Sequence, residues 1–208
     1  MDYNIALLPP SGATDALVEF SANIAGAVVS EFSLGPGALP HITVYLAGIP
    51  PHSLSTVIAR AQEETLRYGA SPVVVAGWTV IRDLVMLKCA VSAQIELLHR
   101  DIVNRIAPLR DRQPAEIWQR GIDTMDQRQH SLLQQFGFPY GLELWKPHIT
   151  IARCAPADLE RIEKPLNAFR LEFVAEDIAV GTVGNAGTFT RALSSWRLGS
   201  FHKKDQFA

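Results

Sequence analysis

Apolar residues recur along this chain with two different periods, and together these periods predict an α+β fold. Helical spacing predicts helices at about 14–32, 53–68, 92–106 and 156–166. Alternation and β-branched runs predict strands at 3–8, 73–81, 84–91, 170–181 and 187–198, with a turn at 184–187 between the last two. Several strands follow one another directly, so antiparallel pairing is expected rather than a doubly wound nucleotide fold.

The tetrapeptide Pro-His-Ile-Thr occurs twice, at 40–43 and at 147–150. Each copy reads as the start of a strand, because proline has no N–H for a sheet ladder and suits a first strand position. Side chains alternate along a strand, so His41 shares a face with Thr43 and His148 shares a face with Thr150. Chance gives a second copy a likelihood of roughly one in a thousand. The repeat therefore calls for a physical reason.

Two histidines and two threonines facing one cleft would suit phosphoester cleavage without a metal. A neutral imidazole takes a proton from water, and a protonated one gives a proton to the leaving ribose oxygen. Thr43 and Thr150 would then hold the non-bridging oxygens. A single His-x-Thr is more often a half-exposed pair on a sheet, but the repeat favours catalysis. The sequence leaves open which histidine, His41 or His148, is the base.

At these residues the sequence resembles the 2H phosphoesterase superfamily, and within it the RNA 2′,3′-cyclic phosphodiesterases, also called 2′-5′ RNA ligases. His41 with Thr43 takes the place of the first family motif, and His148 with Thr150 takes that of the second, within Lys146-Pro-His-Ile-Thr-Ile-Ala-Arg153. The resemblance implies one bilobal domain over 1–208, with two mainly antiparallel sheets and outer helices around a central groove. It also implies no metal or cofactor, and a cyclic phosphate on a nucleotide or RNA end as substrate.

Two residues beside the motifs each have two alternative interpretations. Tyr45 has the strand parity of His41, so it would either line the groove and stack on a base or form a cross-strand aromatic pair. Arg153 falls by parity on the face opposite His148, unless a bend at the strand end turns it inward to bind phosphate. The remaining histidines are interpreted as ordinary surface or boundary residues: His52, His99, His130 and His202.

Composition and net charge indicate which kinds of ligand this protein is expected to bind. The 208 residues are 48% hydrophobic and 19% charged, with a formal net charge of −2. That balance argues against extended nucleic-acid binding, which needs an excess of Lys and Arg, but it allows a small nucleotide or an RNA terminus. Cys89 and Cys154 indicate buried thiols in a reducing compartment. Without an apolar run long enough for a membrane span or a basic leader, we expect a cytoplasmic monomer.

The connection at about 110–136 is longer than the family resemblance leads us to expect. It is polar and predicted to be helical from Ala115, with a thin apolar stripe. It is interpreted as either a surface helix packed on one lobe or a lid over the groove. Two alternatives to hydrolysis also remain: a module that binds a nucleotide or RNA end without turnover, and a reversible 2′-5′ RNA ligase.

Overall fold

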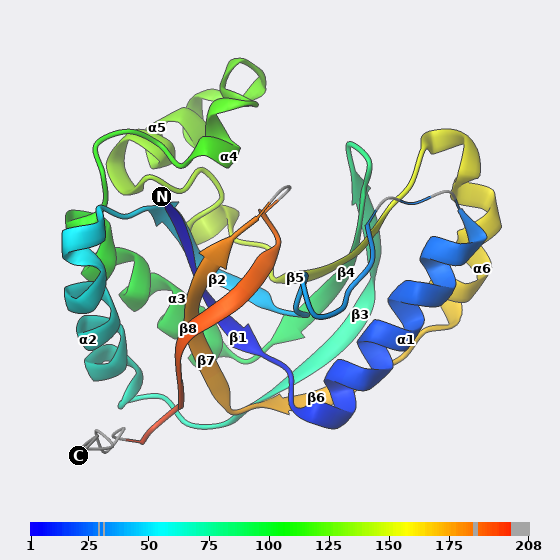
Figure 1. Ribbon diagram of the computed structural model, residues 1–208, viewed down its shortest axis with the longest axis horizontal. Helices are drawn as coiled ribbons and strands as arrows, with labels where there is room; N and C mark the ends of the chain where they lie inside the picture. The colour runs from blue at the N-terminus through cyan, green and yellow to red at the C-terminus, as the bar shows by residue number, and fades with distance from the viewer. Residues whose placement is uncertain (29, 31, 185–186, 201–208) are drawn as a thin grey trace.

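The computed structural model describes residues 1–28, 30, 32–184 and 187–200, and two four-stranded antiparallel sheets form the centre of this part (Figure 1). Sheet A has the order β2-β1-β7-β8, with β1 (Asp2–Leu8), β2 (Ile42–Gly48), β7 (Asp177–Val183) and β8 (Phe189–Arg197). Sheet B has the order β5-β4-β3-β6, with β3 (Ser71–Ile81), β4 (Leu84–Val91), β5 (His148–Arg153) and β6 (Glu172–Ala175). The predicted α+β class with two antiparallel sheets is confirmed.

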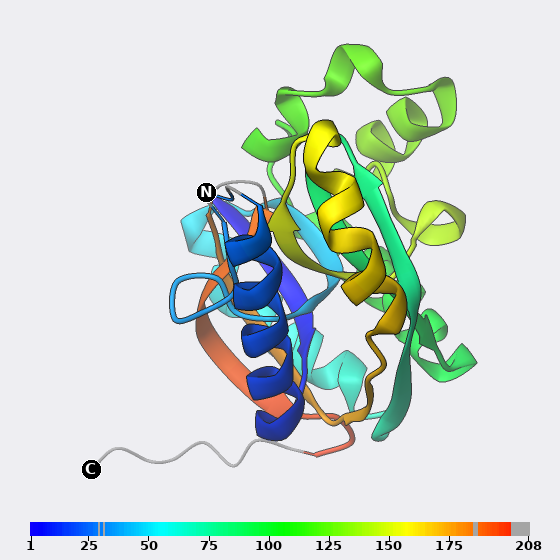
Figure 2. The same cartoon turned by 90° about the vertical axis from the view of Figure 1, so that its right-hand side faces the viewer.

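Two pairs of helices cover the outer faces of the sheets. Helices α2 (Leu54–Thr65) and α3 (Ala93–Ile106) lie beside sheet A, and α1 (Ser11–Ala27) and α6 (Leu159–Ala168) beside sheet B (Figure 1). Figure 2 shows α1 and α6 side by side, where Phe20 stacks on Phe169 with ring centroids 3.9 Å apart. None of the helices in the described residues has the length and apolarity that crossing a membrane requires. Because the helices cover the outer faces, the inner faces of the two sheets remain available for a functional site.

The residues next to helices α3 and α1 explain where these helices begin. Helix α3 follows the prediction: the Ser92 side chain accepts a hydrogen bond from the Ile95 N–H at 3.4 Å, and its apolar stripe is buried. Helix α1 begins directly after Pro10, earlier than predicted, and ends before Val28, whose backbone is extended. Short 3₁₀ turns precede α2 (η1, Pro51–Ser53) and α6 (η5, Pro156–Asp158) and follow α3 (η2, Ala107–Leu109).

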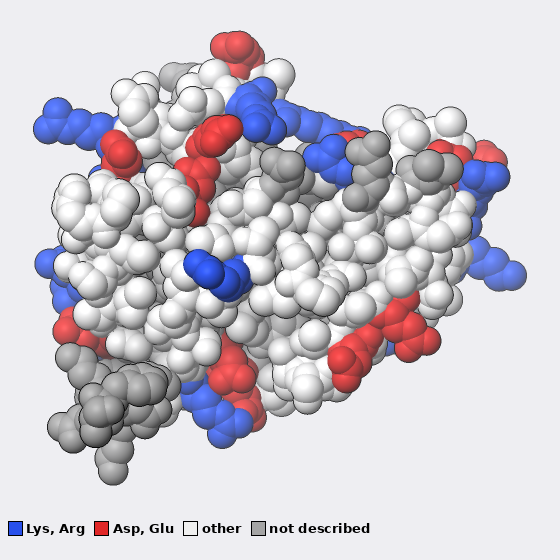
Figure 3. Space-filling view, in the orientation of Figure 1, with Lys and Arg blue, Asp and Glu red and all other residues white. Residues whose placement is uncertain are grey.

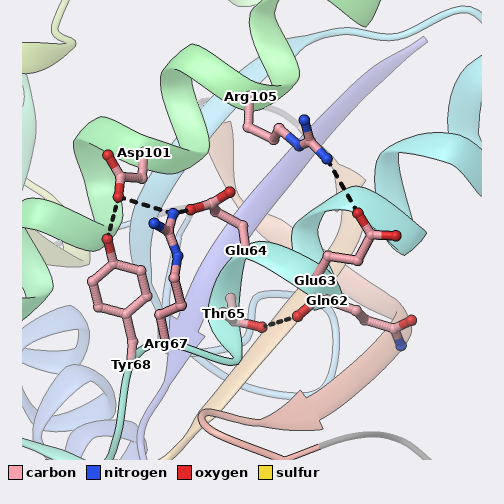
Figure 4. Close-up of polar contacts among 8 residues, drawn as sticks. All are labelled: Gln62, Glu63, Glu64, Thr65, Arg67, Tyr68, Asp101 and Arg105. Atoms are coloured by element: carbon pink, nitrogen blue, oxygen red, sulfur yellow. Dashed lines mark hydrogen bonds and ion pairs between the residues drawn. The ribbon is translucent and has the colours of Figure 1, made fainter.

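Polar contacts join α3 to α2 and to the loop that follows α2 (Figure 4). The Tyr68 hydroxyl donates to Asp101, and Arg105 Nη2 lies 3.2 Å from Glu63 Oε2. Exposed ion pairs contribute at most about 1 kcal/mol each. Burial of the apolar side chains between the helices and sheet A is therefore the larger source of stability here.

The strand predicted over 170–181 is wrong as a single element. It is two strands: β6 pairs with β3 in sheet B, β7 pairs with β1 in sheet A, and the break lies at Glu176. Phe173 and Ala175 are buried in one lobe, whereas Ile178 and Val180 are buried in the other. The apolar alternation thus shifts by one residue at the crossing, where the chain passes from sheet B to sheet A. Of the predicted turn at 184–187, residues 185–186 lie outside the described residues.

The segment at 110–136 is not one continuous helix. It contains α4 (Glu116–Gln119), η3 (Ile122–Thr124) and α5 (Gln127–Phe136), and η4 (Leu142–Leu144) leads on to β5. It packs on the sheet A lobe, where the Trp118 indole N–H donates to the Leu46 carbonyl. It also reaches sheet B, because Arg82 in the β3–β4 turn donates to the Thr124 hydroxyl at 3.3 Å. The segment is therefore a surface element of one lobe with a contact to the other.

Candidate active site

The two motif histidines are held in the same way. Nδ1 of His41 lies 2.9 Å from the Leu39 carbonyl oxygen, and Nδ1 of His148 lies 2.7 Å from that of Lys146. A carbonyl only accepts, so each Nδ1 carries a proton. In the neutral ring the lone pair is then on Nε2, and within the described residues neither Nε2 has a hydrogen-bond partner. Both imidazoles therefore offer the same atom for proton transfer.

A β-bulge follows the threonine in each motif. Between β1 and β2 the register passes from Ala6–Thr43 to Ile5–Tyr45, which leaves Val44 as the extra residue. Between β4 and β5 it passes from Met86–Thr150 to Val85–Ala152, which leaves Ile151. A bulge reverses the alternation of faces beyond it. The two motifs thus share a backbone irregularity as well as a sequence.

The first bulge corrects the assignment of Tyr45 as a groove residue. Beyond Val44 the alternation is reversed, so Tyr45 points into the core, where it is 1% exposed. Its hydroxyl donates to the Phe136 carbonyl at 2.6 Å, and burial raises its pKa. A side chain this enclosed has no free face on which a base could stack, so the prediction that Tyr45 lines the groove is wrong.

The second bulge has the opposite consequence for Arg153. Because Ile151 is the extra residue, Arg153 pairs with Leu84 and lies on the sheet face of His148 and Thr150. This is the inward turn at the strand end that alternation alone does not predict. Its Nη1 lies 3.1 Å from Oδ2 of Asp83, and both side chains are more than 40% exposed. Arg153 thus lies near the site, with its charge engaged by a carboxylate.

His99 of α3 and Trp145, which lies between η4 and β5, support the first bulge. His99 Nδ1 donates to the Val44 carbonyl at 2.7 Å, and its Nε2 accepts from the Leu142 N–H at 2.8 Å. Trp145 stacks on His99 with ring centroids 4.3 Å apart, and its indole N–H donates to the Thr43 carbonyl at 2.9 Å. His99 is 2% exposed, so its interpretation as a surface or boundary residue is wrong.

Sequence reasoning had a signal for His99. The residue lies four positions after Ile95 and three before Ile102, which places it on the buried stripe of α3. A polar residue on such a stripe needs hydrogen-bond partners. Charged residues of α3, such as Arg100, lie instead on the exposed face of the helix.

The second bulge is supported from α1. The Ser21 hydroxyl donates to the Ile151 carbonyl and accepts from the Leu34 N–H, the latter at 2.8 Å. Ser21 is fully buried. Each motif is therefore tied at its bulge to the helix behind its sheet: the first motif to α3 and the second to α1.

The two motifs meet at one small, open pocket. It is lined by His41 and Thr150 together with Phe32, Leu34, Ala38, Leu39, Gly187 and Thr188. His41 rests near the buried ring of Phe189, with centroids 5.5 Å apart. A Cβ on Gly181 would collide with that ring, so the ring's position depends on glycine there. A residue from each motif thus reaches the same solvent-accessible space.

Burial keeps both imidazoles neutral near pH 7. It lowers the pKa of His41 to about 4, against the opposing effect of the Leu39 carbonyl and with a further lowering by positive charge on His148. Burial also lowers the pKa of His148, opposed by the Lys146 carbonyl. A proton on one ring therefore disfavours a proton on the other.

We expect His148→Gln to raise the pKa of His41, because it removes a positive charge that disfavours protonation of that ring. The pKa should stay below the ordinary histidine value of about 6.5, since burial is the larger cause. An NMR titration of the imidazole carbons measures both values. His130→Gln in α5 serves as the control and should leave His41 unchanged. An unaltered His41 titration in His148→Gln would show that the two rings do not interact.

Comparison with known proteins finds one matching family model and several solved structures with a similar fold. The model of the 2′-5′ RNA ligase superfamily matches residues 32–185, which include both motifs. The crystal structure of TT0787 of Thermus thermophilus has 18% identity and a TM-score of 0.62, covering 97% of this chain and 100% of that one. E. coli LigT complexed with NADP+ has 12% identity and a TM-score of 0.55, covering 95% and 98%. At these identities the likeness concerns the fold. No curated protein matches the sequence.

Proposed function

This chain belongs to the 2′-5′ RNA ligase superfamily of 2H phosphoesterases, and on that premise we propose that it hydrolyses the 2′,3′-cyclic phosphate of a nucleotide or RNA end without a metal. The observation that carries the proposal is the matched pair of imidazoles, His41 and His148. Each has its Nδ1 proton bound to a backbone carbonyl, and the charge of one affects the other. This arrangement supports acid–base catalysis by one proton shared between two rings.

The proposed reaction is an in-line displacement at phosphorus. One neutral imidazole accepts a proton from water at Nε2, and the water oxygen bonds to phosphorus. The bond from phosphorus to one ribose oxygen breaks, and that oxygen takes a proton from Nε2 of the other, protonated ring. The Thr43 and Thr150 hydroxyls donate to the non-bridging oxygens. The substrate's negative charge favours protonation of one ring, which offsets the lowering of the histidine pKa values by burial.

Arg153 is part of the proposed binding site. Its ion pair with Asp83 is partly exposed, and such pairs contribute at most about 1 kcal/mol. An anionic substrate on the same sheet face can therefore displace Asp83 and take up the bidentate geometry that guanidinium offers to phosphate.

A short substrate fits the surface charge. Figure 3 shows that, on the face drawn there, Lys and Arg side chains form separate groups rather than a continuous track. A protein that grips long nucleic acid needs such a track to release many counterions. We therefore propose a small nucleotide or an RNA terminus as the ligand of a monomer, with no extended nucleic-acid contact.

The test is hydrolysis of 2′,3′-cyclic AMP in excess EDTA, followed by chromatography that separates 2′-AMP from 3′-AMP. We expect turnover in EDTA, and 3′,5′-cyclic AMP serves as the control that should remain intact. RNA with a cyclic phosphate end is the second substrate, and an added RNA with a 5′-hydroxyl reveals any 2′-5′-linked product of ligation. Turnover of neither substrate would contradict the proposal, and binding without turnover would favour the binding-module alternative.

A further inference from the structure

Asn4 of β1 is a buried polar residue in contact with a motif threonine. It is fully buried, and its Nδ2 donates to the Thr43 hydroxyl oxygen at 2.8 Å. Its Oδ1 is also buried and has no hydrogen-bond partner among the described residues. An unpaired buried acceptor costs about 1–3 kcal/mol, and a β-branched residue would suit a central strand better. Stability alone therefore gives no reason for asparagine here.

The contact determines where the Thr43 proton points. A hydroxyl has one proton and two lone pairs. Since the Asn4 amide donates to Oγ1, the hydroxyl proton is directed away from Asn4 and is free for another acceptor. The Thr43 backbone is fixed as well, because Trp145 binds its carbonyl. Thr43 is thereby held as a hydrogen-bond donor before any substrate arrives.

The second motif has no such arrangement. Asn4 pairs with the third residue after Thr43, and Leu84 pairs with the third residue after Thr150, so Leu84 occupies the corresponding place. Leucine has nothing to donate. Within the described part of the chain, the Thr150 hydroxyl makes no hydrogen bond. The two threonines therefore differ, although their motifs are identical in sequence.

We propose that Asn4 is a positioning residue that directs the Thr43 hydroxyl proton toward a non-bridging phosphate oxygen, which makes Thr43 the preset donor and Thr150 the adjustable one. The inference rests on the proposed phosphodiester hydrolysis. A preset donor stabilises the charge that develops in the transition state without reorganisation during the reaction. The orphaned Oδ1 is the stability cost of that geometry.

Asn4→Asp tests the direction of the hydrogen bond. A carboxylate only accepts, so it would draw the Thr43 proton away from the substrate. We expect kcat for 2′,3′-cyclic AMP to fall at least tenfold, with a smaller change in KM, since removing an oxyanion donor costs about 100- to 1000-fold in other enzymes. The new charge also repels phosphate, and this repulsion persists in a Thr43→Val background. The part of the loss that comes from repulsion should therefore remain in the Thr43→Val background. A loss that is several-fold larger in the parent than in Thr43→Val supports the proposal, and equal losses in both backgrounds overturn it.

Asn4→Leu provides a second test that does not add a charge. It removes an orphaned polar atom, so the midpoint of thermal unfolding should hold or rise while kcat falls several-fold. The loss should be non-additive with Thr43→Val and additive with the matched variant Thr150→Val. Additivity with both would overturn the proposal.

A failure of the proposed function is distinguishable from a failure of this inference. If the wild type shows no turnover, the same variants are compared by calorimetric binding of 2′-AMP and 3′-AMP. Coupling of Asn4 to Thr43 but not to Thr150 in these affinities still supports the inference. Equal or absent coupling overturns it.

Discussion

His41→Ala and His148→Ala should each lower kcat for 2′,3′-cyclic AMP by at least about 100-fold, because each removes a positioned acid or base whose contribution is typically 100- to 10,000-fold. The fold should persist, since each ring is only partly buried and loses one hydrogen bond to a carbonyl, worth about 1 kcal/mol. The double variant should be little slower than either single one, because the two groups act in one step.

The control for these variants is His130→Ala, which removes a partly buried histidine from α5. It should leave kcat unchanged, and circular dichroism should show the same fold in all variants. If either motif variant retained more than a third of the wild-type rate, its histidine would not be the acid or the base.

The two motif histidines should also determine how the rate depends on pH. The base must be neutral and the acid protonated, and the pKa values of both free imidazoles are lowered. Because kcat/KM reports the free enzyme, its bell-shaped profile should have its maximum below pH 6.5. Bound anionic substrate raises these pKa values, so the maximum of kcat should lie at higher pH. A kcat/KM maximum above pH 7.5 would contradict the protonation states inferred here.

The sequence predicts the motif strands up to their threonines and no further. Alternation correctly places His148 with Thr150, because the register stays regular across those residues, whereas β2 begins at Ile42, one residue after His41. One extra residue in each strand then reverses the faces. A β-branched valine or isoleucine at the bulge looks the same as one within a regular strand, so the local sequence carries no sign of it. The sheet face on which the residues beyond the bulges lie is therefore set by tertiary structure, and the sequence alone does not predict it.

Other features are visible in the sequence, but strand and helix periodicity alone does not explain them. The crossing at Glu176 is visible as a one-residue shift in the apolar alternation, but the shift can be interpreted only once the two sheets are known. His99 lies on the buried stripe of α3. Asn4 is different: a single asparagine in an apolar strand does not reveal that its partner is a threonine 39 residues away. Its role comes from the register of β1 against β2.

These features give the two halves of the site a common plan with different details. Each motif begins at the edge of a sheet, bulges after its threonine and is tied to the helix behind that sheet. The first motif has a histidine in this role and a buried asparagine on its threonine, whereas the second has a serine and a leucine in the corresponding places. Similar platforms thus support two chemically distinct sides, which suits the proposed reaction with one acid and one base.

His99→Leu should lower the free energy of unfolding by about 2–6 kcal/mol, because it leaves the Val44 carbonyl and the Leu142 N–H without partners, at about 1–3 kcal/mol each. It should also lower kcat, because the hydrogen bond from His99 to the Val44 carbonyl holds in place the bulge that follows Thr43. His99→Gln is the matched variant: its amide offers both a donor and an acceptor, so we expect a smaller loss. Urea denaturation measures both, and equal losses would show that packing alone explains the role of His99.

The same residue makes stability depend on pH in a direction that can be worked out. Burial lowers the pKa of His99 to about 4 in the folded protein, against about 6.5 when unfolded. The unfolded chain thus binds more protons between these values, so the contribution of neutral His99 is complete above pH 6.5 and is lost as the pH falls toward 4. His99→Gln should reduce this slope, whereas the exposed control His52→Gln should not. Equal slopes in wild type and His99→Gln would place the acid sensitivity at the motif histidines instead, because burial lowers their pKa values in the same direction.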